Sequence, residues 1–526
     1  MPVRYTLRTS VIPIRQPCHQ GLSRLLRRRT LLRSLAALSL LRHQKTAATR
    51  AASQPHIIVI LLDDLDAESV AYMPITQERV FSRGVNFTQF FATTPLCAPS
   101  RATLLTGLYA HNHGVLRNTG ENAGYRTFRA FNGETVATAL RRAGYQTALI
   151  GKFMNGYPAS DEPADRLPEG WDTWIAGADH AAYTGENYEL NENGVVTQYG
   201  NSRDDYLTDV IARHAMTFLT NALPSQPTFL FFAPYAPHSP SLPAREDRDS
   251  FAGAKAPRGG SFNERRVKKK PRWVRQSPLL SETRISKLDE NYRDRLETLQ
   301  AADRAIGKLL DTVESSGTAE NTYVFFLSDN GYFLGEHRQP HGKDAPYDAA
   351  TRVPLAVVGP DLPAGTTVTS VTGNTDMVPT ILELAGASLS AEPDGRSLLP
   401  VIHGDSGSER RYLLLEGFGK ETEEHEAGET MTPPFSALRG SGLLYAEYAT
   451  GERELYDKRD DPAELKNRVS DINEDLVRRY RDLVANLASC RGTTCRQFEN
   501  DPLAPKERER SRRHKKNRRR GRIVNG

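Results

Sequence analysis

The chain is poor in cysteine, with only four in 526 residues, at positions 18, 97, 490 and 495. So few cysteines exclude a small fold in which disulfides replace a hydrophobic core. Cys490 and Cys495 lie close enough in the segment CRGTTC to form one local disulfide. Cys97 stands alone, and a lone cysteine in a chain of enzyme size is a candidate nucleophile.

Long apolar runs are also missing, since no stretch reaches the roughly 18 residues that a membrane-spanning helix needs.

Acidic residues are missing from residues 1–55, which hold 11 Arg or Lys. There, RRRTLLR at 27–33 precedes a short apolar segment and a run of small residues. This order predicts an export signal and leader over residues 1–53, of twin-arginine type, with a basic leader or mitochondrial-type presequence as the alternative.

We therefore expect a protein without a membrane span that is secreted, periplasmic or held at the cell surface. In a eukaryote, the same signal would lead through the endoplasmic reticulum or to the lysosome. The other end of the chain is basic too, because residues 506–522 hold 11 Arg or Lys against two Glu. Residues 499–526 are predicted to be a basic, disordered tail, and binding to a polyanion is the alternative.

Five short apolar runs predict buried parallel strands, at 56–62, 146–150, 228–233, 322–327 and 354–358. Helical patterns lie between them, at 135–143 and over the longer stretch 286–315. Strands that alternate with helices predict a doubly wound α/β sheet flanked by helices. We assign it to a catalytic domain over residues 54–400.

A basic insert interrupts this pattern at residues 252–275, which carry nine Lys or Arg against Glu264. Its prolines and glycines predict an inserted surface loop. After residue 400 the pattern changes to short antiparallel strands at 412–415, 441–448 and 452–456, followed by a helix at 463–487. These elements predict a smaller C-terminal α+β subdomain over residues 401–498.

Polar residues follow the carboxyl ends of four predicted strands: Asp63 and Asp64, Lys152, His238, and Asp329 and Asn330. Ligands bind outside the carboxyl ends of strands in open α/β sheets, so we expect these side chains to converge. The two Asp-containing pairs supply oxygen ligands, which suit Ca²⁺ or Mg²⁺ better than zinc. An Asp after a strand can instead cap a helix.

Cys97 opens the segment CAPSRATLLTG, in which Pro99 and Ser100 suit the first turn of a helix. Cys97 would then lie at a helix N-terminus, where free backbone N–H groups and the helix dipole attract anions. The residues alone leave two interpretations open, a thiolate nucleophile and a buried structural cysteine.

The segment 97–107 resembles the sulfatase signature CxPSRxxxxTG at every fixed position. The resemblance extends over roughly residues 54–490, through LLDDLD, GKFMNGY, APHSP, SDNGYFLGEH, GKDAPYDAATRVPL and ELYDKRDDPAELKN. GKFMNGY, HNHG at 111–114 and CRGTTC are most similar to the N-acetylglucosamine-6-sulfatase and arylsulfatase branch. The family implies an alkaline-phosphatase-like mixed sheet and the hydrolysis of sulfate esters.

The resemblance also implies roles for the residues. Cys97 would be converted to formylglycine (3-oxoalanine) by a formylglycine-generating enzyme, and its hydrated aldehyde would attack sulfur. One Ca²⁺ would be bound by Asp63, Asp64, Asp329 and Asn330. The diol, the sulfate and the leaving oxygen would be held by Arg101, Lys152, His238 and Lys343. The expected substrate is a sulfated amino sugar of glycosaminoglycan type, or else a small aryl sulfate.

One position departs from the family. Many sulfatases have a histidine two residues after the strand-end lysine, and this chain has Met154 there. The sequence therefore does not identify the base that would deprotonate the second hydroxyl and release sulfate. His111 and His113 are candidates, although a surface or supporting role suits each of them better.

Two other functions remain open. Phosphatases and phosphodiesterases of the same superfamily hold two metals, whereas Asp329 followed by Asn330 favours a single cation. A non-catalytic polyanion-binding protein is the other alternative, and the basic insert and tail support it. In a sulfatase, Lys268, Lys269, Lys270 and Trp273 of the insert could form a landing surface for a sulfated polymer substrate. The complete set of site residues favours an enzyme, and no nucleic-acid partner is expected.

Overall fold

The computed structural model describes residues 54–131, 133–163, 165–419 and 431–502. The predicted export signal and the basic tail after residue 502 lie outside the described residues. Within the described ranges, none of the helices combines the length and apolar character needed to cross a membrane.

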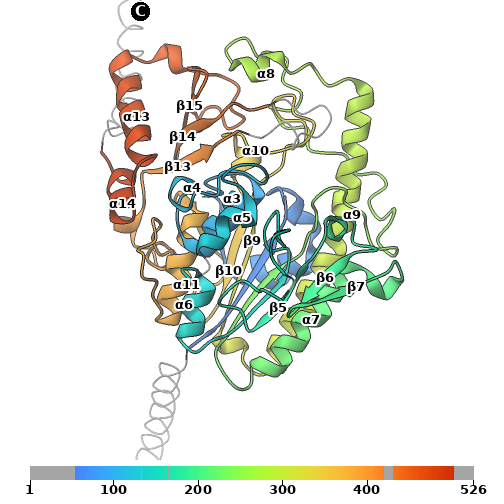
Figure 1. Cartoon of the computed structure of the whole chain (residues 1–526). Helices are drawn as coiled ribbons and strands as arrows, with labels where there is room; N and C mark the ends of the chain where they lie inside the picture. The colour runs from blue at the N-terminus through green and yellow to red at the C-terminus, as the bar shows by residue number, and fades with distance from the viewer. Residues whose placement is uncertain (1–53, 132, 164, 420–430, 503–526) are drawn as a thin grey trace, which may run out of the picture. The chain divides into compact units, whose positions relative to one another are not determined.

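A ten-stranded mixed sheet forms the centre of the described part, in the order β11-β2-β10-β9-β1-β8-β4-β5-β6-β7 (Figure 1). Its strands are β1 (His56–Leu62), β2 (Val85–Phe87), β4 (Gln146–Gly151), β5 (Thr173–Gly177), β6 (Glu189–Glu192), β7 (Val195–Gln198), β8 (Thr228–Ala233), β9 (Thr322–Ser328), β10 (Leu355–Val358) and β11 (Thr366–Val368). The five strands β9, β1, β8, β4 and β5 run parallel to one another. Their carboxyl ends therefore meet at one edge of the sheet.

Strand β1 shows how both faces of the sheet become buried. Ile57 and Val59 pack into one apolar core, and Ile58 and Ile60 pack into the other, because successive side chains point to opposite faces. The first face is covered by α3 (Cys97–Thr106), α5 (Gly124–Phe128), α6 (Val136–Arg142) and α11 (Met377–Ala385). The second is covered by α7 (Leu207–Ala222) and α9 (Glu282–Ser315). This arrangement confirms the predicted doubly wound α/β fold.

The direction of β10 was predicted wrongly, since it runs antiparallel to β9 and to β2. The connection from β9 contains only the short helix α10 (Asp348–Thr351). A parallel neighbour needs a crossover that returns the chain to the opposite edge, usually through a long helix. Without one, β10 starts near the edge where β9 ends.

A second, four-stranded antiparallel sheet contains β13 (Tyr412–Gly417), β14 (Phe435–Gly440), β15 (Leu443–Tyr448) and β16 (Arg453–Asp457). Sequence analysis missed β14. It also started the following helix too early, at residue 463, because α13 runs from Glu474 to Leu487. The side chain of Asn473 accepts a hydrogen bond from the Leu476 N–H at 2.8 Å and so caps the helix there.

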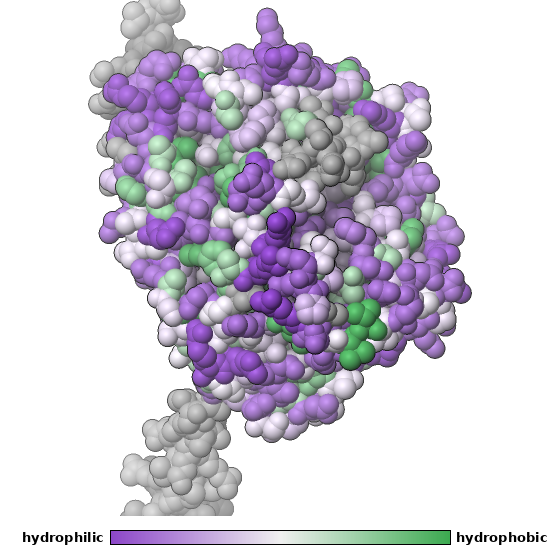
Figure 2. Space-filling model, viewed as in Figure 1, coloured by the Kyte–Doolittle hydropathy of each residue, from purple (hydrophilic) through white to green (hydrophobic). Residues whose placement is uncertain are grey.

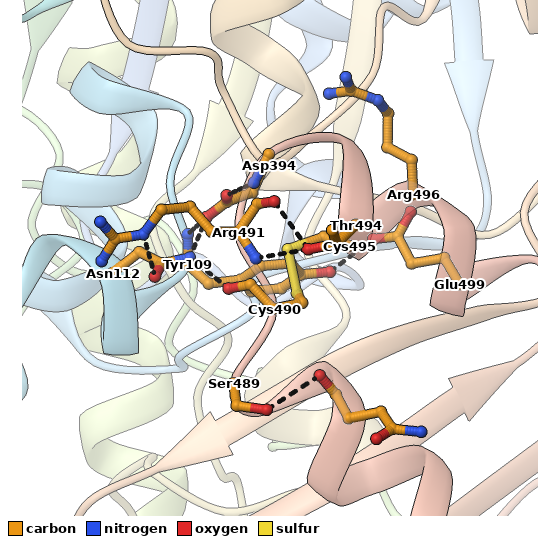
Figure 3. Close-up of a disulfide and its surroundings, with 12 residues drawn as sticks. Tyr109, Asn112, Asp394, Ser489, Cys490, Arg491, Thr494, Cys495, Arg496 and Glu499 are labelled. Carbon is orange, nitrogen blue, oxygen red and sulfur yellow. Dashed lines mark hydrogen bonds between the residues drawn. A yellow bond between two sulfur atoms is a disulfide. The ribbon is translucent and has the colours of Figure 1, made fainter.

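Cys490 and Cys495 are joined by a disulfide between α13 and α14 (Thr493–Glu499) (Figure 3). The bridged loop packs against the chain that follows the signature helix α3. Asp394 ties the two together, because its carboxylate accepts from the Gly492 N–H at 2.6 Å and from the Tyr109 N–H at 2.8 Å. The shorter elements are β3 (Phe90–Phe91), β12 (Thr372–Gly373), α2 (Pro74–Thr76), α4 (Ala110–His113), α8 (Arg272–Gln276) and α12 (Leu399–Ile402).

The basic insert is only partly a surface loop. Lys268 and Lys269 are exposed, and the surface over α8 is hydrophilic (purple in Figure 2). Lys270 and Trp273, by contrast, are only 2% and 4% exposed. Their expected place on an exposed landing surface is therefore wrong. The Trp273 ring packs into the apolar core beneath the C-terminal sheet, which removes its large apolar surface from water.

Candidate active site

Cys97 is the first residue of α3 and is buried beside the carboxyl end of β1. Its Sγ lies 3.6 Å from Asp63 Oδ1 and 3.9 Å from Asp64 Oδ1. One candidate ligand atom each from Asp63, Asp64, Cys97 and His238 lies within 4.8 Å of the others. Segments far apart in the sequence thus converge at the sheet edge, as the strand ends predicted.

Three buried cations face these acidic groups. Lys152 Nζ donates to Asp63 Oδ2 at 2.5 Å, and Arg101 Nε donates to Asp329 Oδ2 at 2.8 Å. Lys343 Nζ contacts the Asp64 carboxylate and donates to Cys97 Sγ at 2.9 Å. A charge taken out of water is costly unless it is paired, so this centre keeps cations and carboxylates in contact.

These charges set the protonation of the carboxylates and the thiol. Burial raises the pKa of the Cys97 thiol to about 12, against the opposing effect of the nearby lysines. The thiol is therefore protonated at neutral pH, which disfavours a thiolate nucleophile. Burial also acts to raise the pKa of Asp64, but Lys343 and His238 outweigh it and hold that pKa at about 2. Burial and the neighbouring Asp63 raise the pKa of Asp329 to about 6.

The predicted metal ligands form a site that suits an oxygen-liganded cation. Asn330 Nδ2 donates to Asp64 Oδ1 at 2.7 Å, and the backbone N–H of Asp64 donates to Asp329 Oδ1 at 3.1 Å. Asn330 Oδ1 is buried and accepts no hydrogen bond among the described residues. A buried acceptor without a donor, next to carboxylates, fits a hard cation. Elsewhere in the described ranges no further cluster of His, Cys, Asp and Glu has metal-binding geometry.

Comparison with known proteins identifies the family. The Sulfatase family pattern matches residues 55–387, and the pattern of the N-sulphoglucosamine sulphohydrolase C-terminal domain matches residues 335–489. This chain belongs to the sulfatase family. It is accordingly a sulfuric ester hydrolase.

Relatives of this sulfatase include N-acetylglucosamine-6-sulfatases and an arylsulfatase, the two groups that its sequence motifs resemble. N-acetylglucosamine-6-sulfatase of Capra hircus is 32% identical, over 86% of this chain and 86% of that protein. The human N-acetylglucosamine-6-sulfatase is also 32% identical, over 84% of this chain and 86% of that protein. An arylsulfatase of Volvox carteri is 29% identical, over 88% of this chain and 79% of that protein.

Solved structures share the fold of this sulfatase. A protein in complex with its substrate D-glucosamine-2-N,6-O-disulfate superposes with a TM-score of 0.68 at 23% identity, over 86% of this chain and 100% of that one. The phosphonate monoester hydrolase of Agrobacterium radiobacter has a TM-score of 0.63 at 20% identity, over 84% of this chain and 96% of that one. The same fold thus carries different ester hydrolyses, and the site residues have to distinguish them.

The histidines considered as the base have other partners. His113 Nε2 lies 3.1 Å from Thr103 Oγ1, and His113 Nδ1 accepts from the Val115 N–H. His111 contacts Glu416 and the carbonyl of Cys490, and so joins α4 to the C-terminal part of the chain. Met154 is buried in the apolar core. These contacts suit supporting roles for both histidines.

Sequence analysis missed Tyr183, which stands beside the catalytic candidates. Its ring centroid lies 4.6 Å from that of His238, and Lys152 Nζ lies 5.1 Å from the Tyr183 centroid. It belongs to the short helix η4 (His180–Thr184), which follows β5, a strand that sequence analysis did not predict. Only the fold brings this side chain to the site.

Two further residues support the site from a distance in the sequence. Ser100 Oγ donates to the Asp329 carbonyl at 2.5 Å and accepts from Asn374 Nδ2 at 3.0 Å. On α9, Arg295 donates to the carbonyls of Asp64 at 2.5 Å and Pro237 at 3.2 Å, joining the loops after β1 and β8. A sequence signal for Arg295 did exist, since it interrupts the apolar face of a predicted helix.

Proposed function

We propose that this sulfatase hydrolyses 6-O-sulfate esters of N-acetylglucosamine-type sugars, with formylglycine derived from Cys97 and one Ca²⁺. The observation that carries this proposal is the position of Cys97. It opens the helix of a complete CxPSR signature, between the Asp63–Asp64 pair and Lys343. Its relatives support the sugar substrate, because proteins named N-acetylglucosamine-6-sulfatase match over most of the chain.

The complete signature around Cys97 supports oxidation to formylglycine as the way to obtain a nucleophile. Hydrated formylglycine would supply one hydroxyl to attack sulfur and a second hydroxyl to release sulfate and restore the aldehyde. Lys152 and Arg101 lie around this position and would hold the sulfate oxygens. Both are buried and paired, so their charges are fixed before the substrate arrives.

His238 and Lys343 would stabilise the leaving oxygen. The His238 side chain is 22% exposed and its Nε2 lies 3.6 Å from Asp64 Oδ2, so it can reach both solvent-borne substrate and the acidic pair. Lys343 contacts the other oxygen of the Asp64 carboxylate, and its Nζ lies 2.9 Å from Cys97 Sγ. Attack on sulfur adds negative charge to the leaving oxygen, and preorganised donors at that point typically contribute a factor of about 10² to 10³ in rate.

We assign the Ca²⁺ to Asp63, Asp64, Asp329 and Asn330. The unpartnered Asn330 Oδ1 and the crowded carboxylates support this assignment. The cation would polarise the sulfate and offset the charge of Asp63 and Asp64. The same donor set disfavours a two-metal phosphatase, because the described residues offer one such cluster.

Export completes the proposal. The Cys490–Cys495 disulfide is typical of an oxidising compartment, and a related Caenorhabditis elegans protein is named an extracellular sulfatase homologue. That relative is 35% identical over 66% of this chain, which covers 49% of its length. Exposed Lys268 and Lys269 on the insert would favour a sulfated polymer over a small ester.

The test is expression together with a formylglycine-generating enzyme, followed by mass spectrometry of the peptide that contains Cys97. We expect the mass of formylglycine, and turnover of N-acetylglucosamine-6-sulfate in proportion to it. Cys97→Ala should fold normally and show no turnover. An active preparation with only unmodified cysteine would contradict the nucleophile. A preference for aryl sulfate over the sulfated sugar would favour a small-molecule arylsulfatase instead.

A further inference from the structure

We propose that residues 261–277, which start within the basic insert and extend two residues beyond it, act as a clamp that positions Lys343. This inference rests on the proposed role of Lys343 at the leaving oxygen. The clamp, meaning residues 261–277, grips the loop formed by residues 331–347, and this loop carries Lys343 into the active site. From its charge, the insert was predicted to be a surface that binds a polymer. The buried side of the insert instead contacts the loop that carries Lys343.

Backbone hydrogen bonds join the clamp to the loop. The N–H of Asn263 donates to the Gly335 carbonyl at 2.8 Å, and the N–H of His337 donates to the Ser261 carbonyl at 2.8 Å. Between them, Phe262 pairs with Glu336 in an antiparallel bridge. The clamp and the loop thus form a short antiparallel ladder. This ladder fixes the register of the loop relative to the clamp.

The gripped part of the loop has an unfavourable backbone conformation. His337 has a φ of 49° and Arg338 a φ of 68°, which are left-handed values that a Cβ disfavours. Such residues persist only where their surroundings hold them. The clamp supplies this restraint, because Arg338 Nε donates to the Glu264 carbonyl at 2.7 Å and Arg338 Nη1 donates to the Ser277 carbonyl at 2.9 Å.

Buried charges lock the clamp in place. Glu264 Oε2 lies 3.0 Å from His337 Nδ1 and 3.8 Å from Lys270 Nζ. Lys270 Nζ also donates to the backbone carbonyl of Glu464, and it lies 4.6 Å from the ring centroid of Tyr347. One buried ammonium therefore contacts the clamp, the loop and the C-terminal part of the chain together.

The loop transmits this restraint to Lys343. The N–H of Gly335 donates to the Gln339 carbonyl and the N–H of Phe333 donates to the Gly342 carbonyl, each at 2.8 Å, so the two sides of the loop are tied together. Gly342 directly precedes Lys343, whose Nζ lies 2.9 Å from Cys97 Sγ. A shift at the clamp would therefore move this ammonium relative to the nucleophile. Glu264 and Lys270 are positioning residues for Lys343.

The test is a double-mutant cycle between the clamp and Lys343 in the full-length protein. Glu264→Gln and Lys270→Met are each made in the wild type and in Lys343→Ala. Arg266→Met, an exposed change in the same segment, is the matched control. Turnover is expressed per formylglycine measured by mass spectrometry, so that incomplete maturation does not lower it artificially.

We expect each clamp variant to lower kcat on the order of 10- to 100-fold in the wild-type background, because small misplacements of a catalytic group cost this much. KM should change little. In the Lys343→Ala background the same changes should have less than about a twofold effect, since interacting positions are not additive. Arg266→Met should match the wild type in both backgrounds.

Equal losses in both backgrounds would overturn the clamp, because they would show a general structural effect. Unchanged kcat in folded Glu264→Gln would overturn it as well, and this nearly isosteric variant remains informative if Lys270→Met fails to fold. Lys343→Ala with wild-type kcat would overturn both the clamp and the proposed role of Lys343. Formylglycine-dependent turnover in that variant would still leave the nucleophile of the proposed function intact.

Discussion

Two buried carboxylates in different regions of this sulfatase, Asp64 and Glu336, have pKa values shifted in opposite directions. At the catalytic centre, burial would raise the pKa of Asp64, but Lys343 and His238 hold it at about 2. Where the clamp meets the loop, burial raises the pKa of Glu336 to about 7, and the nearby Asp66 and Glu68 act in the same direction. Asp64 therefore stays ionised at neutral pH, whereas a substantial fraction of Glu336 is protonated there.

Removing a cation from the centre should have the largest effect. Lys152→Met leaves the buried Asp63 without its closest partner, 2.5 Å away. We expect a loss of about 3–5 kcal/mol in the free energy of unfolding and of about 10² to 10³ in kcat. Urea unfolding and steady-state kinetics measure the two. Lys268→Met is the control, and equal urea midpoints for both variants would contradict the pairing.

Removing the charge of Glu336 by Glu336→Gln should stabilise the folded protein at alkaline pH. The folded-state pKa lies above the ordinary value of 4.5, so the wild type loses stability as pH rises from about 4.5 to about 7. The amide does not titrate, and at pH 8 the variant should be more stable by up to about 3 kcal/mol. Near pH 4.5 the two proteins should be equal. Parallel stability curves across this range would show that Glu336 ionises normally.

Removing the proposed Ca²⁺ should destabilise the folded protein, because the carboxylates of the centre then repel one another. With Ca²⁺ at about a hundred times its dissociation constant, binding adds about 2.7 kcal/mol to the stability of the folded protein. We therefore expect the Tm to fall in chelator and to recover with added Ca²⁺. Asn330→Ala should reduce the recovery, because it removes a proposed ligand. A Tm that is the same with chelator and with Ca²⁺ would contradict the site.

The exposed side of the insert should contribute least. Neutralising Lys268 and Lys269 together should change the free energy of unfolding by less than about 0.5 kcal/mol, as exposed substitutions usually do. Turnover of a small sulfate ester should stay the same. Turnover of a sulfated oligosaccharide should fall, and the difference should disappear as salt screens the charges over about 8–10 Å. Equal rates on both substrates at low salt would remove this surface from substrate binding.

Prediction from the sequence succeeded where a local pattern is tied to a general rule of folds. The apolar runs before Asp63 and Asp329 correctly placed two adjacent strands, and the carboxyl-edge rule then brought their polar residues together. It failed for β10, whose apolar run showed a strand but not its direction. It also failed for Trp273, since composition indicates a basic segment without telling which residues turn inward.

By itself, the sequence determined the elements whose signal is local, which are the apolar strands and the helix that starts at Cys97. It also gave the family signature, from which the nucleophile is predicted. Only the tertiary structure showed which groups outside the predicted strand ends and the signature join them. Tyr183, Arg295 and Asn374 reach the site from segments without a motif. The physical reason is that periodicity reports burial along one element, whereas contact depends on how separate elements pack. The same packing turned Lys270 from a predicted surface charge into a buried link between three parts of the chain.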